Sequence, residues 1–501
     1  MASLNEQISK KPWLGWLLFI LTIVVVFVLG LFASSITERR AEALVVNKPK
    51  VEVKELEPRN EVWGQNYPRE FETYYDTKDT TFKSKYNGSA MIDMLEEFPS
   101  LVILWAGYGF SKDYNQSRGH YYAVEDIYNT LRTGGPKTES DGPMPSTCWT
   151  CKSPDVPRYM KEIGITEFYS AKWATFGPEI VNPIGCADCH DEKTMNLEIT
   201  RPALKEAFER QGKDITKATH QEMRSLVCAQ CHVEYYFAKN QPGKEKANYL
   251  TFPWDNGTKV EEVEEYYDKI EFSDWTHALS RTPMIKAQHP GYEIYQTGIH
   301  AQRGVSCADC HMPYKSEGGQ KFTDHKIQSP LNNIANSCQV CHRQSEATLA
   351  KNVLDHQDRV IDIRGKLEHL LAITHIEAKF AWDKGATEEQ MKDILMDIRH
   401  AQWRWDYGAA SHGGSFHSPV ETARVLSSGI SIAGDARLKL SELLAKLGHI
   451  GPVPIPDIST KAKAQAYLGM PMDELNQEKA EFVENVVPQW LAKAKERESK
   501  Y

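Results

Sequence analysis

Five Cys-x-x-Cys pairs account for every cysteine of this chain and constrain its fold more than any other feature. Four pairs are followed by histidine, whereas the first is followed by Lys152. A Cys-x-x-Cys-His run is the attachment signature of a c-type haem, in which two thiols bind the porphyrin and the next residue binds the iron. The pairs are Cys148 and Cys151, Cys186 and Cys189, Cys228 and Cys231, Cys307 and Cys310, and Cys338 and Cys341, and the histidines are His190, His232, His311 and His342.

Zinc clips and disulfides are the two alternative uses of paired cysteines. Zinc needs four ligands at each site, and two of these pairs together could supply them. Zinc does not explain a histidine after four of the five pairs. The spacing therefore predicts five covalently bound c-type haems, whose attachment implies the outer side of an energy-transducing membrane, which in bacteria is the periplasmic side.

Lys152 marks one haem as different from the others. A neutral lysine amine can bind iron through its single lone pair, whereas an ammonium cannot. We expect the haem with this unusual ligand to carry the chemistry, and the others to conduct electrons. Low-spin electron-transfer haems have two axial ligands, so the four histidine motifs need four partners from the thirteen remaining histidines. Composition cannot choose them, but those in predicted long helices are expected to be solvated or hydrogen-bonded: His356, His369, His375 and His400.

The overall composition, 41% hydrophobic and 25% charged, is that of an ordinary globular protein. The net charge of −9 gives no support for nucleic-acid binding. The same charge would repel an anionic substrate, so any attraction for one has to come from locally placed cations.

An apolar run of about 20 residues lies near the N-terminus, at 13–33. It is long enough to cross a bilayer as a helix and longer than the ~7–15 apolar residues of a cleaved signal. We predict that residues 1–40 are a membrane anchor or uncleaved signal. Lys10 and Lys11 stay in the cytoplasm, and the body lies on the periplasmic side of the inner membrane. The alternative is a soluble periplasmic protein after signal cleavage.

The rest of the chain divides into an extended tether at 41–60, a haem-binding catalytic region at 61–345 and long helices at 346–501. Helices are predicted over 343–383, 387–410 and 418–448, and a loop over 240–260. Strand signals are few, so we predict a mainly α multihaem cytochrome c with closely packed haems, few short strands and long C-terminal helices that form a homodimer interface. A helical apolar stripe supports this: Val353, Val360, Leu367, Leu371 and Ala378.

The run Cys148-Trp149-Thr150-Cys151-Lys152, followed by four Cys-x-x-Cys-His motifs, resembles pentahaem cytochrome c nitrite reductase, the ammonia-forming enzyme. The resemblance covers about residues 60 to 490, and its motifs are highly specific because five attachment sites occur in the family's order with lysine first. It implies the six-electron reduction of nitrite to ammonium at the lysine-ligated haem, fed by four bis-histidine haems, in respiratory nitrite ammonification. Where the family commonly has serine, this chain has Thr150.

The resemblance also implies roles for individual residues. Arg132, twenty residues before Lys152, matches an arginine on the distal side of the active haem. Tyr235 follows the third motif, and His289 lies in a Lys-x-Gln-His run, as in the family. The implied distal ligands are His325 for the second haem, His120 for the third, His417 for the fourth and His300 for the fifth. The implied calcium ligands are the Glu234 carboxylate, the Gln288 side-chain oxygen and the carbonyls of Tyr235 and Lys286.

Two rival functions remain to be distinguished. A purely electron-transferring multihaem cytochrome would have histidine at position 152 and two ligands on every iron. A reductase or oxidase for another nitrogen or sulfur substrate would keep Lys152, but Arg132, Tyr235 and His289 together favour nitrite. The family resemblance suggests a membrane quinol-oxidising multihaem cytochrome c as electron donor.

Overall fold

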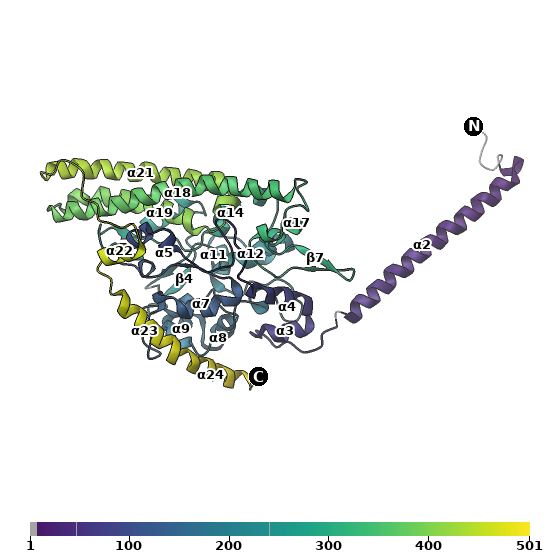
Figure 1. Ribbon diagram of the computed structural model, residues 1–501. Coiled ribbons are helices and arrows are strands. Elements are labelled where there is room, and N and C mark those ends of the chain that lie inside the picture. The colour runs from purple at the N-terminus through teal and green to yellow at the C-terminus, as the bar shows by residue number, and fades with distance from the viewer. Residues whose placement is uncertain (1–7, 47, 240, 501) are drawn as a thin grey trace.

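The computed structural model describes residues 8–46, 48–239 and 241–500. Helix makes up 58% and strand 6% of the chain. The predicted mainly α fold with few short strands and long C-terminal helices is therefore confirmed. The body carries three long helices along one side, and one helix, α2 (Pro12–Val46), projects away from it (Figure 1).

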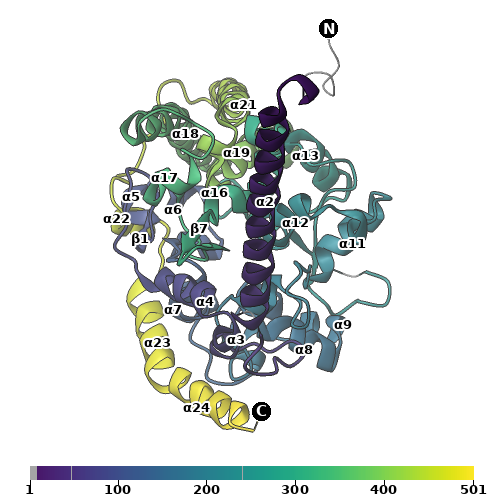
Figure 2. The ribbon, with the colours of Figure 1, turned by 90° about the vertical axis from the view of Figure 1, so that its right-hand side faces the viewer.

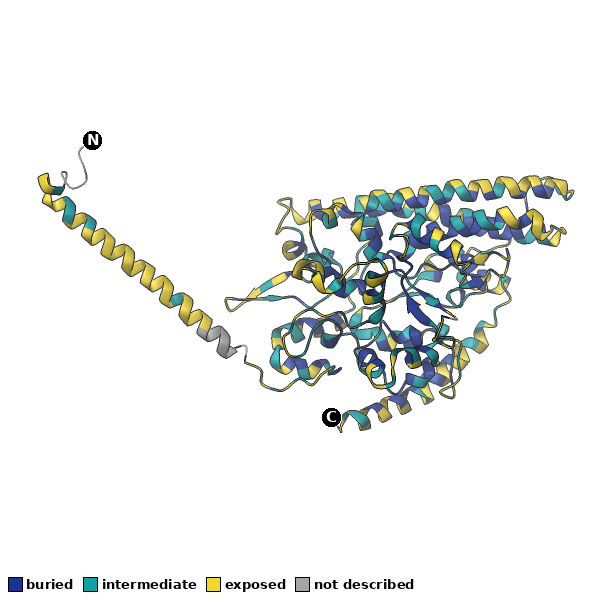
Figure 3. Cartoon of the chain, turned by 180° about the vertical axis from the view of Figure 1, so that it is seen from behind, coloured by how far each residue is buried: buried dark blue, intermediate teal, exposed yellow. Residues whose placement is uncertain are grey.

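Helix α2 stands clear of the body in Figure 1 and in the view turned by 90° (Figure 2). Its segment Pro12–Arg40 is long and apolar enough to cross a membrane, and none of its most apolar stretch is buried (Figure 3). The helix continues to Val46, so the expectation of an extended chain from residue 41 is wrong for 41–46. Ala41, Glu42 and Ala43 favour helix, and the break comes only near Pro49, whose ring disfavours helical backbone before it.

The three long helices are α18 (Glu346–Asp383), α19 (Glu388–Ala410) and α21 (Pro419–Lys446), close to their predicted bounds. They lie side by side along the body (Figure 1). Ser345 caps α18 by accepting a hydrogen bond from the Thr348 N–H, and Thr387 caps α19. All five residues of the predicted apolar stripe on α18 are buried. The stripe therefore packs α18 against the neighbouring helices.

Shorter helices build the rest of the body. They are α3 (Asn60–Asn66), α4 (Pro68–Tyr75), α5 (Met94–Glu97), α6 (Ser100–Leu104), α7 (Ala123–Asn129), α8 (Asp155–Ile163), α9 (Ile165–Ser170), α11 (Pro202–Arg210), α13 (Val260–Lys269), α14 (Gly291–Gln296), α15 (Ile299–Gln302), α20 (Gly414–His417), α22 (Lys461–Tyr467), α23 (Met472–Asn485) and α24 (Val487–Glu498).

Four antiparallel two-stranded ladders complete the described structure. They pair β1 (Ile92–Asp93) with β2 (Asn115–Gln116), β3 (Tyr236–Ala238) with β4 (Tyr249–Thr251), β5 (Trp275–Thr276) with β6 (Pro283–Met284), and β7 (Tyr314–Glu317) with β8 (Gln320–Thr323). Strand β4 lies within 240–260, so the prediction of a loop there is wrong for 249–251. Tyr249 and Leu250 are buried, and their pairing with β3 satisfies backbone groups that water cannot reach.

The cysteine motifs lie in short helical turns. The second motif forms α10 (Cys186–Cys189), the third ends α12 (His220–Ala229), the fourth forms α16 (Cys307–His311), and the fifth follows α17 (Ile334–Ser337). The first begins in a 3₁₀ turn, Ser146–Trp149. Residues three apart on a helical turn face the same side, so both thiols of a motif point the same way.

The C-terminal helices close the core behind the first motif. The Trp149 ring stacks on Trp173 with ring centroids 4.9 Å apart, and Trp490 of α24 meets Trp173 edge-on at 5.5 Å. Gly177 lies so close to Trp490 that a Cβ there would be 2.2 Å from the indole. Residues more than 300 positions apart in the chain therefore support the loop that carries Lys152.

Candidate active site

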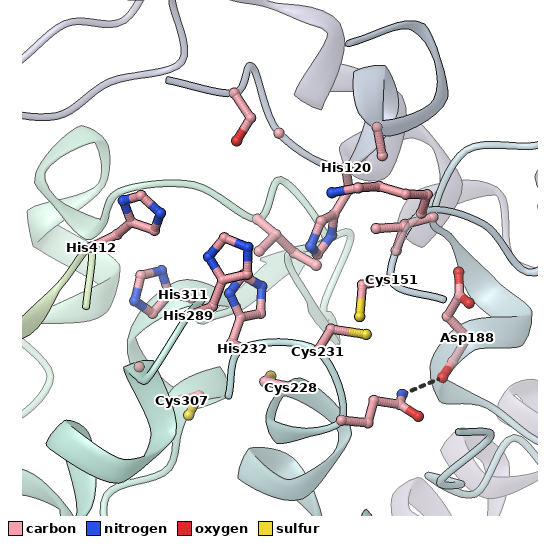
Figure 4. A pocket seen from close by; sticks show the side chains of 18 of the residues that line it. His120, Cys151, Asp188, Cys228, Cys231, His232, His289, Cys307, His311 and His412 are labelled. Carbon is pink, nitrogen blue, oxygen red and sulfur yellow. Dashed lines mark hydrogen bonds between the residues drawn. The ribbon is translucent and has the colours of Figure 1, made fainter. Parts of the chain in front are cut away.

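A cavity of about 1160 Å³ runs through the body, and every cysteine of the five motifs except Cys341 lines it. This exceeds the roughly 300–1,000 Å³ of an ordinary small-molecule site. All ten cysteines are free, so the disulfide alternative is not formed. Among the described residues, no group of three or more His, Cys, Asp or Glu side chains is arranged to hold a metal ion. In Figure 4 the sulfur atoms of Cys151 and Cys231 lie beside each other.

The structure brings together each motif histidine and the distal histidine expected for it. A ring nitrogen binds a transition metal at about 2.0–2.1 Å and lies about 1.1 Å from the ring centre, so rings on opposite sides of one iron have centroids about 6.2 Å apart. The observed centroid separations are 6.3 Å for His190 and His325, 6.2 Å for His232 and His120, 6.1 Å for His311 and His417, and 6.3 Å for His342 and His300. These residues fit four bis-histidine haems.

Backbone carbonyls orient several of these rings. The Nδ1 atoms of His190, His311 and His325 lie 2.8–2.9 Å from the carbonyl oxygens of Met195, Gln328 and Thr323, respectively. An Nδ1–H that donates to a carbonyl leaves Nε2 unprotonated and free to bind a metal. The tautomer that iron requires is thus the one that the backbone favours. By contrast, the four histidines expected to be solvated or hydrogen-bonded are so. His356 and His369 are exposed, His375 is hydrogen-bonded to Ser280 and Gln402, and His400 is hydrogen-bonded to Asp268.

Lys152 lines the same cavity as the three side chains that the sequence placed with it: Arg132, Tyr235 and His289. The rings of Tyr235 and His289 lie 6.4 Å apart between centroids. The side chain of Arg132 is held by Nε, which donates to the Thr130 hydroxyl at 3.2 Å, and by its contact with the Phe110 ring, 4.3 Å away. Within the described part of the chain, no acceptor bonds its two terminal nitrogens, so they are available to an anion.

The protonation states of these groups follow from their surroundings. Burial holds the pKa of His289 well below its usual value. Burial raises the pKa of the Tyr235 phenol well above its usual value. At neutral pH His289 is therefore a neutral imidazole and Tyr235 a protonated phenol. The neutral N–H of His289, the neutral O–H of Tyr235 and the cationic guanidinium of Arg132 thus line the same cavity.

Three of the four residues expected to hold calcium, Glu234, Gln288 and Lys286, are linked by hydrogen bonds, and the fourth, Tyr235, follows Glu234 in the chain. Glu234 is fully buried, and its carboxylate accepts hydrogen bonds from the Gln288 N–H at 2.6 Å and the Tyr267 hydroxyl at 3.0 Å. The Gln288 side-chain amide donates to the Lys286 carbonyl at 3.1 Å. Burial raises the pKa of Glu234 well above its usual value, so a cation here would favour the carboxylate. A carboxylate, an amide and backbone carbonyls are oxygen ligands that fit Ca²⁺.

Three further residues reach this site without having been assigned to it from sequence. His412 lies 5.7 Å from His289 between ring centroids (Figure 4), and its position five residues before His417 in a glycine-rich break was the only signal for it. Tyr108 lines the cavity and stacks on Trp275 at 4.6 Å. Asp274 accepts the Lys286 N–H at 2.8 Å, and burial raises its pKa to about 7. No sequence pattern singled out Tyr108 or Asp274.

One family model and several known proteins are similar to this chain. A family model described as Cytochrome c552 matches residues 59–499. The chain is 61% identical over 487 residues to cytochrome c-552 of Parabacteroides distasonis, and 62% identical over 486 residues to that of Bacteroides thetaiotaomicron, with 97% of each chain covered. Among solved structures, it resembles the catalytic subunit of a cytochrome c nitrite reductase with two calcium sites from Desulfovibrio desulfuricans. The TM-score is 0.75 and the identity 32%, over 80% of this chain and 90% of that one.

Proposed function

The chain belongs to the Cytochrome c552 family, and on that premise we propose that it reduces nitrite to ammonium at a haem attached to Cys148 and Cys151 and ligated by Lys152. The observation that carries the proposal is a single cavity lined by Lys152 together with Arg132, Tyr235 and His289. None of the four histidine ring pairs is assigned to the lysine motif. The likeness to a solved cytochrome c nitrite reductase supports it. Four bis-histidine haems, assigned to the four ring pairs, deliver the electrons.

When bound, the haems supply iron for one-electron transfer and, beside Lys152, a coordination position for the substrate. Everything else falls to side chains of this chain. Nitrite is an anion approaching a protein of net charge −9, so its attraction has to be local. The unbonded nitrogens of Arg132 provide charge-assisted hydrogen bonds that hold and orient it.

His289 and Tyr235 serve the proton-consuming part of the reaction. Converting nitrite into ammonium takes six electrons and eight protons, and both oxygens leave as water. A nitrite oxygen that gains negative charge as its bond to nitrogen breaks needs a donor already in place. The neutral imidazole of His289 and the phenol of Tyr235 are such donors, and solvent protons restore them.

We assign calcium to the Glu234 carboxylate, the Gln288 side-chain oxygen and the carbonyls of Tyr235 and Lys286. An ion bound there would tie the segment that ends in Tyr235 to the segment that ends in His289. These segments come from distant parts of the chain, and in the described structure the Gln288 N–H joins them directly by its 2.6 Å hydrogen bond to the Glu234 carboxylate. The ion would thus fix the spacing of the two proton donors.

We place the protein on the periplasmic side of the inner membrane, anchored by α2, with soluble periplasmic protein after signal cleavage as the alternative. The exposure of α2 and its apolar length support the anchor. We propose that a membrane quinol-oxidising multihaem cytochrome c supplies the electrons, and that two copies of the chain associate through the long helices.

The test is nitrite turnover by purified holoprotein and its His289→Ala variant. Loss of a donor of this kind costs about 10²–10³-fold in turnover, so we expect a loss in that range with five haems still attached. Arg132→Ala should raise the nitrite KM as well as lower kcat, and Tyr235→Phe should slow ammonium formation. His369→Ala, an exposed position on α18, serves as the control and should behave as the parent.

Two outcomes would reject the assignment. A resting spectrum with five low-spin haems and no high-spin haem would identify an electron-transfer cytochrome without its own chemistry. If the parent turns over sulfite, or a small nitrogen compound other than nitrite, faster than nitrite, and His289→Ala slows that reaction equally, the rival reductase would be identified.

A further inference from the structure

Arg201 binds the backbone on both sides of Lys152. Its guanidinium is buried, with 1% of the residue exposed. Nε donates to the Thr150 carbonyl at 2.7 Å, and a terminal nitrogen donates to the Ser153 carbonyl at 2.8 Å. The other terminal nitrogen donates to the Thr200 hydroxyl at 2.6 Å. The bend that carries Lys152 is therefore held at both flanks by one rigid, planar cation.

The same arginine joins three attachment motifs. Asp188, inside the second motif, accepts from the guanidinium at 2.5 Å and also caps its own helix through the Gly185 N–H at 2.8 Å. Gln230, inside the third motif, accepts the Arg201 backbone N–H at 3.1 Å and donates to the Asp188 carbonyl at 2.7 Å, the dashed line in Figure 4. A buried network of hydrogen bonds thus connects the first three motifs through Arg201, Asp188 and Gln230.

Lysine needs such support more than histidine does. The His190 and His311 rings are oriented by a second nitrogen that bonds a backbone carbonyl. The Lys152 amine has no second nitrogen and ends a flexible four-carbon side chain. Its position can therefore be set only through its backbone and the packing of its stem. We propose that Arg201 is a positioning residue that fixes the Lys152 amine against the iron, in support of the function proposed above.

A second arginine provides a contrast within the same chain. Arg224 pairs with Asp309 of the fourth motif at 3.0 Å, as Arg201 pairs with Asp188. Its other described partners are the side chains of Ser306 and Tyr314, and it donates to no motif carbonyl. The fourth motif ends in histidine, whose ring has its own carbonyl partner. The backbone clamp thus occurs at the lysine motif and not at this histidine motif.

The experiment compares Arg201→Lys with Arg224→Lys in the holoprotein. Lysine keeps the positive charge beside the aspartate but cannot bond two carbonyls in one plane. Removing an outer partner of a metal ligand costs about 10–100-fold in activity, so we expect Arg201→Lys to lower kcat for nitrite by that range. The nitrite KM should change little, because Arg132 is intact. The electron paramagnetic resonance signal of the high-spin haem should change, while the four low-spin signals and the haem content stay. Arg224→Lys should leave the high-spin signal unchanged.

An unchanged high-spin signal and kcat in Arg201→Lys would overturn the inference, and so would equal changes in both variants, since these would indicate a general packing role. If Arg201→Lys fails to take up five haems, Thr200→Val is tested in its place. This variant removes one hydrogen bond to the guanidinium and should shift the high-spin signal by a smaller amount. An unshifted signal would refute the inference. A parent without a high-spin signal or nitrite turnover would instead reject the proposed function.

Discussion

Removing the Asp406 carboxylate should destabilise the protein and disturb the active site together. Lys286 and Asp406 form an ion pair at 2.8 Å with 2% and 0% of their side chains exposed. The ammonium also donates to the Ala287 carbonyl at 2.6 Å, and the Trp105 indole N–H donates to Asp406 at 3.3 Å. The pair therefore joins helix α19 to the segment that leads to His289.

The magnitude follows from the burial of both partners. In Asp406→Ala the Lys286 ammonium stays in the interior with one carbonyl as its remaining described acceptor, and breaking a buried pair in this way costs about 3–5 kcal/mol. Replacing both partners by apolar residues of similar volume is often neutral or stabilising, so Lys286→Met/Asp406→Leu should recover most of the loss. Because Lys286 also offers its carbonyl to the proposed calcium site, Asp406→Ala should lower nitrite turnover as well.

The assay is urea unfolding of the holoprotein followed by far-ultraviolet circular dichroism. A lower midpoint at unchanged slope reports a change in the free energy of unfolding. The control is Asp362→Ala, which breaks the exposed Lys366–Asp362 pair and should change the free energy by less than about 0.5 kcal/mol. A loss below about 1 kcal/mol for Asp406→Ala, or a double variant no more stable than the single one, would refute this reasoning.

Three other expectations concern packing, pH and the membrane. Gly177→Ala places a Cβ 2.2 Å from the Trp490 ring and should cost about 1–3 kcal/mol in unfolding free energy, whereas Gly434→Ala, with open space around it, should stabilise by up to about 1 kcal/mol. Burial would lower the pKa of His400, but its 2.6 Å contact with Asp268 raises it above the usual value. The His400–Asp268 pair should therefore contribute its full share to the free energy of unfolding below pH 6.5 and lose it as the pH rises through the raised pKa of His400. Urea titrations of His400→Gln should lack this pH-dependent loss of stability. N-terminal sequencing should find α2 in the mature protein; a start at residue 35 or later would identify a cleaved signal.

The sequence alone determined the features whose cause is local. A Cys-x-x-Cys turn needs only four neighbouring residues, so the haem attachment positions and the unusual Lys152 could be predicted from the sequence. The apolar period of α18 and the apolar length of α2 are likewise properties of single segments. The resemblance to a known family added the distal histidines, which composition could not select from thirteen candidates.

The way in which distant segments meet became visible in the folded molecule. The tertiary structure placed His412 beside His289, and it joined Arg201 to carbonyls about 50 residues earlier in the chain. It also paired Lys286 with Asp406 in the interior. A buried charge is favourable only when its partners surround it, and the partners of these residues come from elements far apart in the sequence. Their effect depends on the packing of whole helices, which no local pattern of residues specifies.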